Sequence, residues 1–315
     1  MPPTSFVTPA VAVLIPARDS AGTIRRAVLS ALAQPEATEV VVVDDGSRDA
    51  TARAATSCDD GTGRLRVLTQ ENRGPSAAIN TAQAATRAPY LCVLDADDFF
   101  LEGRLSAIFA GAGSNWDMAA DRLLLAREGF EDGPYERWGG VIPQDGVLSF
   151  AAFVSGNITD PARPRTELGY LQPVIRRAFL DRHRLRHDEA VRLGEDYLLH
   201  ANVLASGGLF RVVENFGYVA VARAQSLSHC HRSADLAALL AADRRLSQRV
   251  STPADRRAIE RHIAHVWRKW VYQQALDAKA DGDMAGALAR VARHPSAWPF
   301  ILAQTMRSRL AAAPV

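Results

Sequence analysis

The chain lacks the features of secreted and membrane-spanning proteins. Its three cysteines, Cys58, Cys92 and Cys230, are far apart and odd in number, which excludes a disulfide framework and favours a reducing compartment. The first ten residues, MPPTSFVTPA, have no basic region of the kind that begins a signal peptide. No apolar run approaches the roughly 18–20 residues that span a bilayer. We therefore expect a cytoplasmic protein, attached at most to the inner face of the membrane.

Two further absences limit the class of function. No GxGxxG sequence stands at a strand-to-helix turn, which argues against a nicotinamide-dependent enzyme. The formal net charge of the 315 residues is only +2, so nothing in the overall charge points to a nucleic-acid partner. The composition, 48% hydrophobic and 23% charged, is that of an ordinary globular protein with material for a core.

Apolar runs alternate with helical patterns in the first hundred residues. Such alternation predicts βαβ units and a parallel sheet. Strands are expected at residues 11–16, 39–44, 64–70 and 90–95, and helices at about 21–33, 49–57 and 77–86.

The second part of the chain is less regular. A fifth strand is expected at 117–127, helices near Phe150 and at 174–183 and 195–205, and two strands in LFRVVEN and GYVAVAR. Helical periodicity then runs from Ala234 to the end. We predict a catalytic domain at 1–232, with a nucleotide-binding half at about 9–100 and an acceptor half at about 101–232, and a helical region at 233–315.

Acidic side chains crowd the end of the fourth strand. Asp95, Asp97 and Asp98 follow the apolar run YLCVL, at the edge where ligands bind in open α/β sheets. Three carboxylates repel one another unless a cation lies among them, and a divalent ion with phosphate oxygens suits that position. The alternative is a solvated acidic turn before the next helix.

Several segments in one order resemble the family 2 glycosyltransferases, and more narrowly the bacterial exopolysaccharide enzymes of the succinoglycan type. They are IPARDSAGTI, VVVDDGSRDAT, NRGPSAAIN, LDADD and the stretch YLQPVIRRAFLDRHRLRHDEAVRLGEDYLL, and the resemblance covers about residues 9–232. It implies the GT-A fold, which is a Rossmann-like α/β fold with a mostly parallel central sheet flanked by helices. It also implies a nucleotide-sugar donor, with UDP the usual nucleotide.

The resemblance assigns donor-binding and metal-binding positions. The donor-binding residues would be Pro16, Ala17, Asp19, Asp44, Asp45, Asn72, Gly74, Asp95 and Asp98. Asp97 would hold a Mg²⁺ or Mn²⁺ ion, supported by Asp95, and His229 is a further candidate ligand. Both ions accept oxygen ligands, so the sequence does not choose between them. For Asp44 and Asp45 the alternative is ordinary turn chemistry in Asp-Gly-Ser.

A sugar transfer with inversion needs one more carboxylate. A base must remove the proton of the acceptor hydroxyl as it attacks the sugar. The segment LGEDYLL supplies Glu195 and Asp196 at the start of a helix. The resemblance makes Asp196 the base and Glu195 its neighbour. Alternatively, both residues only favour a helix N-terminus electrostatically. His183 and His187, among arginines in RHRLRH, are interpreted as a basic helix end.

These assignments predict a metal-dependent inverting glycosyltransferase. Its acceptor would be a saccharide or a polyprenyl-linked saccharide of exopolysaccharide or cell-surface polysaccharide synthesis. A non-catalytic sugar-nucleotide-binding module is one alternative. A phosphatase with an Asp-x-Asp motif is another, although such enzymes normally carry the motif on the first strand. In the tail, Trp298, Phe300, Ile301 and Leu302 lie near Arg307 and Arg309, which predicts contact with a membrane surface or packing on the protein itself.

Overall fold

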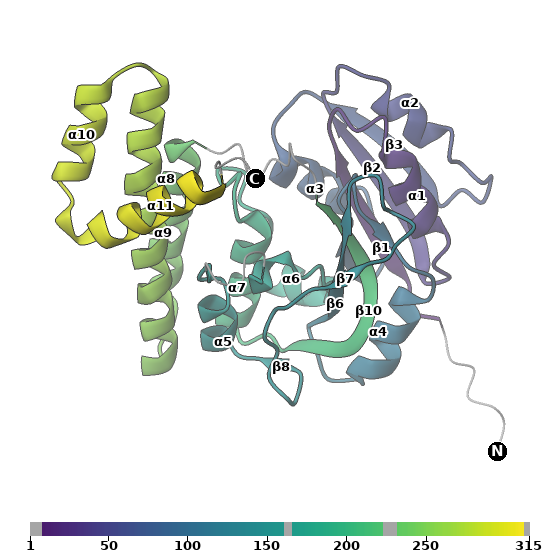
Figure 1. Ribbon diagram of the computed structural model, residues 1–315. Helices are drawn as coiled ribbons and strands as arrows, with labels where there is room; N and C mark the ends of the chain where they lie inside the picture. Colours follow the sequence, from purple (N-terminus) through teal and green to yellow (C-terminus); the bar gives the residue numbers. More distant parts are fainter. Residues whose placement is uncertain (1–7, 161–165, 223–231, 312–315) are drawn as a thin grey trace. The chain divides into compact units, whose positions relative to one another are not determined.

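The computed structural model describes residues 8–160, 166–222 and 232–311, with side chains described up to Met306 in the last helix. The chain divides into two compact units, residues 1–224 and 225–315 (Figure 1). The first unit is built on a mixed sheet and the second is helical, so the predicted α/β class with a helical C-terminal region is confirmed.

One sheet organises the first unit. Its order is β3-β2-β1-β4-β9-β6-β10-β5, with β7 paired to β6 and β8 to β10. The strands of the described chain are β1 (Val11–Ala17), β2 (Ala37–Asp45), β3 (Leu65–Gln70), β4 (Tyr90–Val93), β5 (Phe99–Phe100), β6 (Met118–Arg127), β7 (Glu136–Arg137), β8 (Val147–Leu148), β9 (Val174–Arg176) and β10 (Phe210–Ala222).

The central parallel strands β1 and β2 are buried on both faces. Strands β3, β2, β1 and β4 run parallel, and β6 runs parallel to β10. Val13 and Ile15 in β1, and Val40 to Val43 in β2, have no accessible surface. Continuous apolar runs are what a doubly covered parallel sheet requires, because side chains on both faces meet helices rather than water. This is why the sequence located these strands.

Helices cover the two faces of the sheet (Figure 1). The chain moves outward from β1 through β2 to β3 and then returns to β4. Right-handed crossovers therefore put α1 and α2 on one face and α3 on the other. The helices of the first unit are α1 (Ile24–Leu32), α2 (Thr51–Thr56), α3 (Pro75–Ala84), α4 (Arg104–Ala112), α5 (Phe150–Ser155), α6 (Arg177–His183) and α7 (Glu195–Ala205), with a 3₁₀ turn η1 (Leu168–Tyr170).

Two predictions for the second half of this unit were wrong. The helix expected at 174–183 begins at Arg177, because Val174 to Arg176 form β9, which pairs antiparallel with both β4 and β6. The two strands expected around residue 216 are one strand, β10, whose register against β6 shifts between Val213 and Tyr218. Sheet pairing with distant strands decided both cases, and local periodicity does not report it.

A buried arginine fixes the centre of the first unit. The Arg104 guanidinium donates to Asp121 Oδ1 at 3.0 Å and to the Gln172 carbonyl at 2.6 Å. Burial alone would lower the pKa of Arg104, but the carboxylate of Asp121 outweighs it and the pKa is raised. Asp121 Oδ2 in turn accepts from the Gly217 N–H at 2.7 Å. The network therefore joins α4, β6, β10 and the segment before β9, and it leaves neither charge unpaired.

The second unit is a set of helices. They are α8 (Ser233–Ser247), α9 (Pro253–Ala280), α10 (Met284–Ala292) and α11 (Trp298–Ala311), with a 3₁₀ turn η3 (Pro295–Ala297). Thr252 caps α9 by accepting a hydrogen bond from the Asp255 N–H. Between α8 and α9, His262 Nδ1 lies 2.9 Å from Asp243 Oδ2 in a buried pair. Within the described residues, no helix combines the length and apolar composition that a bilayer crossing requires.

Candidate active site

The ends of β1, β2 and β3 gather the predicted nucleotide-binding residues at one edge of the sheet. Ala17 pairs with Asp44 in the β1–β2 register, and Asp45 pairs with Gln70 in the β2–β3 register. Pro16, one residue earlier, pairs with Val43. The carboxyl ends of parallel strands form the crevice where ligands bind in such folds. The structure therefore brings Pro16 and Ala17 next to the acidic end of β2, as the sequence pattern predicted.

Hydrogen bonds join the loop after β1 to the loop after β2. Asp19 has a positive φ of 48°, and its N–H donates to Ser47 Oγ at 2.9 Å. Its carboxylate accepts from the Arg48 N–H at 2.7 Å. Gly46 has a φ of 71°, and a Cβ there would lie 2.9 Å from the Asn72 nitrogen. Asp19 therefore shapes the loops at this edge, and Asn72 lies against the β2 turn on an exposed part of the β3–α3 loop.

The two aspartates at the end of β2 have different surroundings. Asp45 accepts three hydrogen bonds: at Oδ1 from Gln70 Nε2 and the Arg73 N–H, both at 2.8 Å, and at Oδ2 from the Gly74 N–H at 2.7 Å. It anchors the loop that leads into α3. Asp44 accepts from the N–H and the hydroxyl of Ser47, both at Oδ1. Among the described residues no donor contacts Asp44 Oδ2, so this oxygen can accept from a ligand.

The acidic segment after β4 is anchored by its last aspartate. Asp98 is buried, and its Oδ1 accepts from the Val221 N–H at 2.8 Å while Oδ2 accepts from the Tyr218 hydroxyl at 2.8 Å. These contacts bind the segment to β10. The predicted contact between Asp98 and the nucleotide sugar therefore has to compete with two hydrogen bonds inside the protein.

Asp95 lies where negative charge accumulates. Its N–H donates to the Tyr218 hydroxyl at 3.3 Å. Burial raises the pKa of Asp95 well above its ordinary value, and the nearby carboxylates of Asp98 and Asp196 raise it further. Asp97 is partly buried, and its carbonyl accepts from the Arg26 guanidinium at 3.3 Å. Carboxylates that disfavour one another's ionisation provide a site that a cation stabilises.

The structure places Asp196 close to this acidic segment, since Asp95 and Asp196 interact electrostatically. Gly194, with a φ of 77°, precedes α7, and Asp196 stands in its first turn. Asp196 Oδ2 accepts from Gln172 Nε2 at 2.8 Å, and Oδ1 lies 3.1 Å from His187 Nε2. Burial by itself would raise the pKa of Asp196, but the hydrogen bonds with His187 and Gln172 outweigh it and the pKa is lowered. Asp196 is therefore held as a carboxylate.

The pKa of Glu195, the neighbour of Asp196, is shifted in the opposite direction. Burial and the charge of Asp196 raise the pKa of Glu195 to about 8. At neutral pH the Glu195 side chain is therefore mostly an uncharged carboxylic acid, which can donate a proton or a hydrogen bond but has no free carboxylate to accept a proton. Adjacent carboxyl groups whose pKa values diverge mark a division of acid and base roles.

Gln172, His187 and Tyr218 are the site residues that sequence reasoning missed. His187 was assigned to a basic helix end, but its ring is buried against Asp196, whereas His183 stacks on Phe179 within α6. Arg184, with a φ of 54°, ends α6 and turns the chain inward. Gln172 lies in the quoted segment YLQPV without any local signal of a role. Only the tertiary fold brings Gln172 and His187 to Asp196, and Tyr218 to Asp98.

The donor set suits a divalent cation shared with a ligand. Among the described residues, no group of three His, Cys, Asp or Glu side chains is arranged to hold a metal ion by itself. His229 lies outside the described residues. Mg²⁺ commonly binds through one or two carboxylates and completes its shell with substrate phosphates and water. The carboxylates of Asp97 and Asp95 provide this smaller set, so the residues present fit such an ion.

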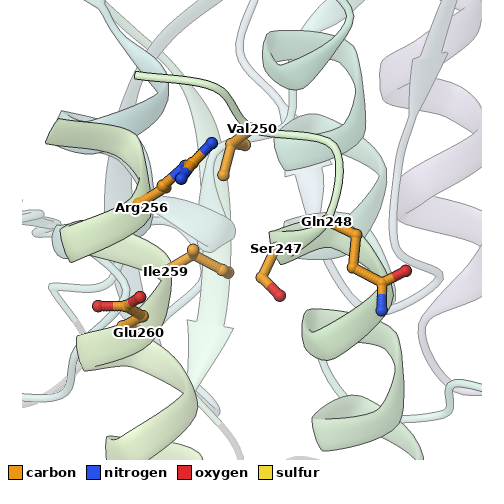
Figure 2. A pocket seen from close by; sticks show the side chains of 6 residues that line it. All are labelled: Ser247, Gln248, Val250, Arg256, Ile259 and Glu260. Atoms are coloured by element: carbon orange, nitrogen blue, oxygen red, sulfur yellow. The ribbon is translucent and has the colours of Figure 1, made fainter. Parts of the chain in front are cut away.

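A second hollow lies in the helical unit. The pocket in Figure 2 has a volume of about 320 Å³ and is lined by residues from the end of α8 to the start of α9: Ser247, Gln248, Val250, Arg256, Ile259 and Glu260. It contains one carboxylate and one guanidinium. This lining lacks the several carboxylates that define the β4 edge, and it gives no reason to expect a nucleotide there.

The chain is similar to known proteins. The model of the family "Glycosyl transferase family 2" matches residues 12–142, which include both acidic strand ends. Succinoglycan biosynthesis protein ExoU of Rhizobium meliloti (strain 1021) is 43% identical over 298 residues, which cover 93% of this chain and 85% of that protein. Succinoglycan biosynthesis protein ExoO of the same organism is 38% identical over 250 residues, with 77% and 69% covered.

Solved structures share the fold at low sequence identity. The S. aureus TarS 1-349 structure in complex with UDP-GlcNAc has a TM-score of 0.57 and 15% identity, and the match covers 91% of this chain and 92% of that one. The mannosyltransferase PcManGT from Pyrobaculum calidifontis, in complex with GDP-Man and Mn²⁺, has a TM-score of 0.57 and 17% identity, with 98% and 82% covered. These likenesses establish the architecture alone.

Proposed function

This chain belongs to glycosyltransferase family 2, and from that membership we propose that it transfers a sugar with inversion from a UDP-sugar to a saccharide or lipid-linked saccharide of exopolysaccharide synthesis. The two succinoglycan biosynthesis proteins support the class of pathway. The TarS complexes with UDP and UDP-GlcNAc support UDP as the nucleotide. The observation that carries the proposal is Asp196, a carboxylate held by two donors beside the acidic end of β4.

Asp196 is suited to act as the general base. Its lowered pKa keeps it ionised, so it can accept the proton of the acceptor hydroxyl. The acceptor oxygen forms a bond to the anomeric carbon while the bond from that carbon to the phosphate oxygen breaks on the opposite face. The nucleoside diphosphate leaves with the electron pair. Glu195, largely protonated near neutral pH, can donate a hydrogen bond to the sugar or the acceptor.

The donor nucleotide is proposed to lie across the ends of β1 and β2. The available Oδ2 of Asp44 can accept a hydrogen bond from the base or the ribose, beside the backbone of Pro16 and Ala17. Asp45, Gly74 and Asp19 hold the surrounding loops in place. Asp97, with Asp95, would hold Mg²⁺ or Mn²⁺. When bound, that ion offsets negative charge on the diphosphate. The Mn²⁺ in the PcManGT complex supports a divalent ion without choosing between the two metals.

A non-catalytic nucleotide-sugar-binding module is the alternative to consider. It would need the nucleotide edge of the sheet but not an oriented carboxylate beside it. The two hydrogen bonds that fix both oxygens of Asp196 are the specific reason to favour catalysis. The phosphatase alternative is disfavoured, because the Asp-x-Asp segment follows β4 rather than β1 and family membership points elsewhere.

A panel of nucleotide sugars tests the proposal. We expect UDP-sugars with Mn²⁺ or Mg²⁺ to raise the unfolding temperature by roughly 5–10 °C at a hundredfold excess over Kd, and GDP- and ADP-sugars to do so less. Adding a lipid-linked saccharide acceptor should release UDP. Stabilisation without release from any acceptor would favour the binding module, and a panel with no stabilising nucleotide sugar would contradict both.

His187 should act as a positioning residue for Asp196. Its Nδ1 is buried and has no partner in the described part of the chain, so Nε2 is the ring nitrogen that meets Asp196. Asn80 in α3 makes two hydrogen bonds to the His187 backbone: Nδ2 donates to the His187 carbonyl at 2.9 Å, and Oδ1 accepts from the His187 N–H at 3.2 Å.

His187→Leu should lower kcat by about 10- to 100-fold with little change in donor KM, as expected for losing one hydrogen bond to a charged group. His187→Gln, which keeps a donor, should retain most of the activity. In the wild type the hydrogen bond with His187 lowers the pKa of Asp196. Losing it in the leucine variant should raise that pKa and move the acid limb of the pH–rate profile to higher pH. An unshifted pH profile in His187→Leu would show that the ring only fills space.

We also propose that the enzyme works at the cytoplasmic face of the membrane, where a polyprenyl-linked acceptor would be presented. Such an acceptor partitions into the bilayer, so an enzyme that binds the surface meets it more often. The helical unit provides the relevant surface.

A further inference from the structure

The last helix has two faces with different partners. Ile301 packs with Val271 and Ala297 in a buried cluster, and the Phe300 ring lies edge-on to His265 and Tyr272. These side chains dock α11 on α9. Two of the four apolar residues that the sequence grouped as a membrane-binding set, Phe300 and Ile301, therefore belong to the interior of the helical unit.

Three other apolar side chains of α11 are exposed to solvent. Trp298, Leu302 and Met306 are 46%, 65% and 66% exposed, and their spacing of four places them along one stripe of the helix. Helix α10 exposes Met284 (54%) and Leu288 (69%) at the same spacing, and buries only Ala287. We call these five residues the apolar stripe.

A hydrogen bond joins the two helices that carry the stripe. Trp298 Nε1–H donates to the Val291 carbonyl near the end of α10 at 2.8 Å. The short turn η3 is the only connection between them. The hydrogen bond places the start of α11 beside the end of α10. Five exposed apolar side chains on two neighbouring helices are more than the single exposed residues that need no explanation.

The sequence of α10 and α11 is basic, and one of its arginines, Arg290, pairs with Asp283, the residue that caps α10. Residues 284–315 contain four arginines, Arg290, Arg293, Arg307 and Arg309, one histidine and no aspartate or glutamate. The whole chain has a net charge of +2, so the rest of it is slightly negative. Exposed apolar side chains among arginines fit a surface that is apolar beneath and anionic above. That combination belongs to the headgroup boundary of an anionic bilayer.

We propose that α10 and α11 bind an anionic lipid surface, with the apolar stripe inserted at the headgroup boundary and the exposed arginine that follows α10, Arg293, against the lipid phosphates. The contact is peripheral, since no described helix is long and apolar enough to cross the bilayer. It depends on neither the catalytic nor the metal assignment.

Vesicle co-sedimentation with the full chain tests the proposal. We expect the protein to sediment with vesicles of phosphatidylglycerol and phosphatidylcholine, to bind pure phosphatidylcholine weakly, and to be released by high salt, since screening weakens the arginine contribution. The variant Leu288→Gln, Leu302→Gln, Met306→Gln should bind at least about 10-fold more weakly. Because these side chains are exposed, its thermal unfolding should match that of the wild type.

A matched control uses apolar residues of similar exposure in the first unit. Phe130 and Val141 are 62% and 66% exposed, and Phe130→Gln with Val141→Gln should leave vesicle binding unchanged. Absence of wild-type binding to anionic vesicles would overturn the proposal, as would an equal loss in the control. A wild-type dimer in solution that the stripe variant converts to a monomer, without vesicle binding, would instead make the stripe a contact between two copies of the chain.

Discussion

Asp196→Asn is expected to lower kcat by at least about 100-fold while leaving donor affinity close to that of the wild type. A base acts on the proton that moves in the transition state, so its removal affects turnover more than ground-state binding. The substitution also disturbs the local hydrogen bonds. Gln172 Nε2 and His187 Nε2 both face the carboxylate, and an asparagine can offer an oxygen to only one of them.

The control should change a carboxylate of the same half without touching the site. Asp181 is exposed on α6, and Asp181→Asn should keep both turnover and donor binding. Steady-state kinetics of UDP release and calorimetric titration of UDP would separate the two effects. If Asp196→Asn turns over near the wild-type rate, Asp196 is only a charge at the start of α7. Glu195 would then be the next candidate, although with a pKa of about 8 it is largely protonated near neutrality.

The nucleotide-binding half of the fold could be predicted closely because its signals are local. Buried parallel strands need unbroken apolar runs, and the β-branched runs VAVLIP and EVVVVD are typical of such strands. The acidic and small residues that follow these runs come at strand ends by the same logic. The position of Asp44 at the mouth of the sheet therefore follows from the sequence and the topology of βαβ units alone.

The acceptor half resisted prediction because its signals are tertiary. The three residues of β9 become a strand only because β4 and β6 offer edges on both sides. Similarly, Gln172 and His187 come from segments separated by α6, and nothing in either segment indicates that both donate to Asp196. Burial of Arg104 against Asp121 is equally invisible in a sequence, where an arginine at a helix start is normally solvated.

The individual roles of the aspartates are also a matter of tertiary contacts. The sequence presents Asp44 and Asp45 as equivalent neighbours, and it separates Asp97, assigned to the metal, from Asp98, assigned to the donor, only through the family resemblance. In the structure Asp45 and Asp98 each accept hydrogen bonds at both carboxylate oxygens from distant parts of the first unit. Asp45 and Asp98 therefore build the edge of the sheet, and Asp44, whose Oδ2 receives no hydrogen bond from the described residues, is better placed than Asp45 to meet a ligand. The two members of each pair should respond differently to the same substitution.

Asp97→Asn is expected to weaken metal-dependent UDP binding by at least about 100-fold and leave thermal stability near that of the wild type. Asparagine keeps the shape of the side chain but removes the charge that a hard cation requires. The Asp97 carbonyl, which accepts from Arg26, is unchanged by the substitution. Titration of UDP with and without Mn²⁺, together with the unfolding temperature, measures both quantities.

Asp98→Asn provides the contrasting variant one residue away. Its carboxylate accepts from the Val221 N–H and the Tyr218 hydroxyl, so an amide nitrogen must face one of these two donors. The hydroxyl can rotate to donate elsewhere but the backbone N–H cannot, and a buried contact of this kind costs about 1–3 kcal/mol of unfolding free energy. A drop in unfolding temperature for Asp98→Asn, with stability kept in Asp97→Asn, would separate the anchoring carboxylate from the metal-binding one. Tight UDP binding by Asp97→Asn, or by the wild type in a chelator, would instead mean that the acidic segment binds UDP without an ion. The repulsion among its carboxylates would then be reduced by protonation of Asp95, whose pKa is raised, rather than by a metal.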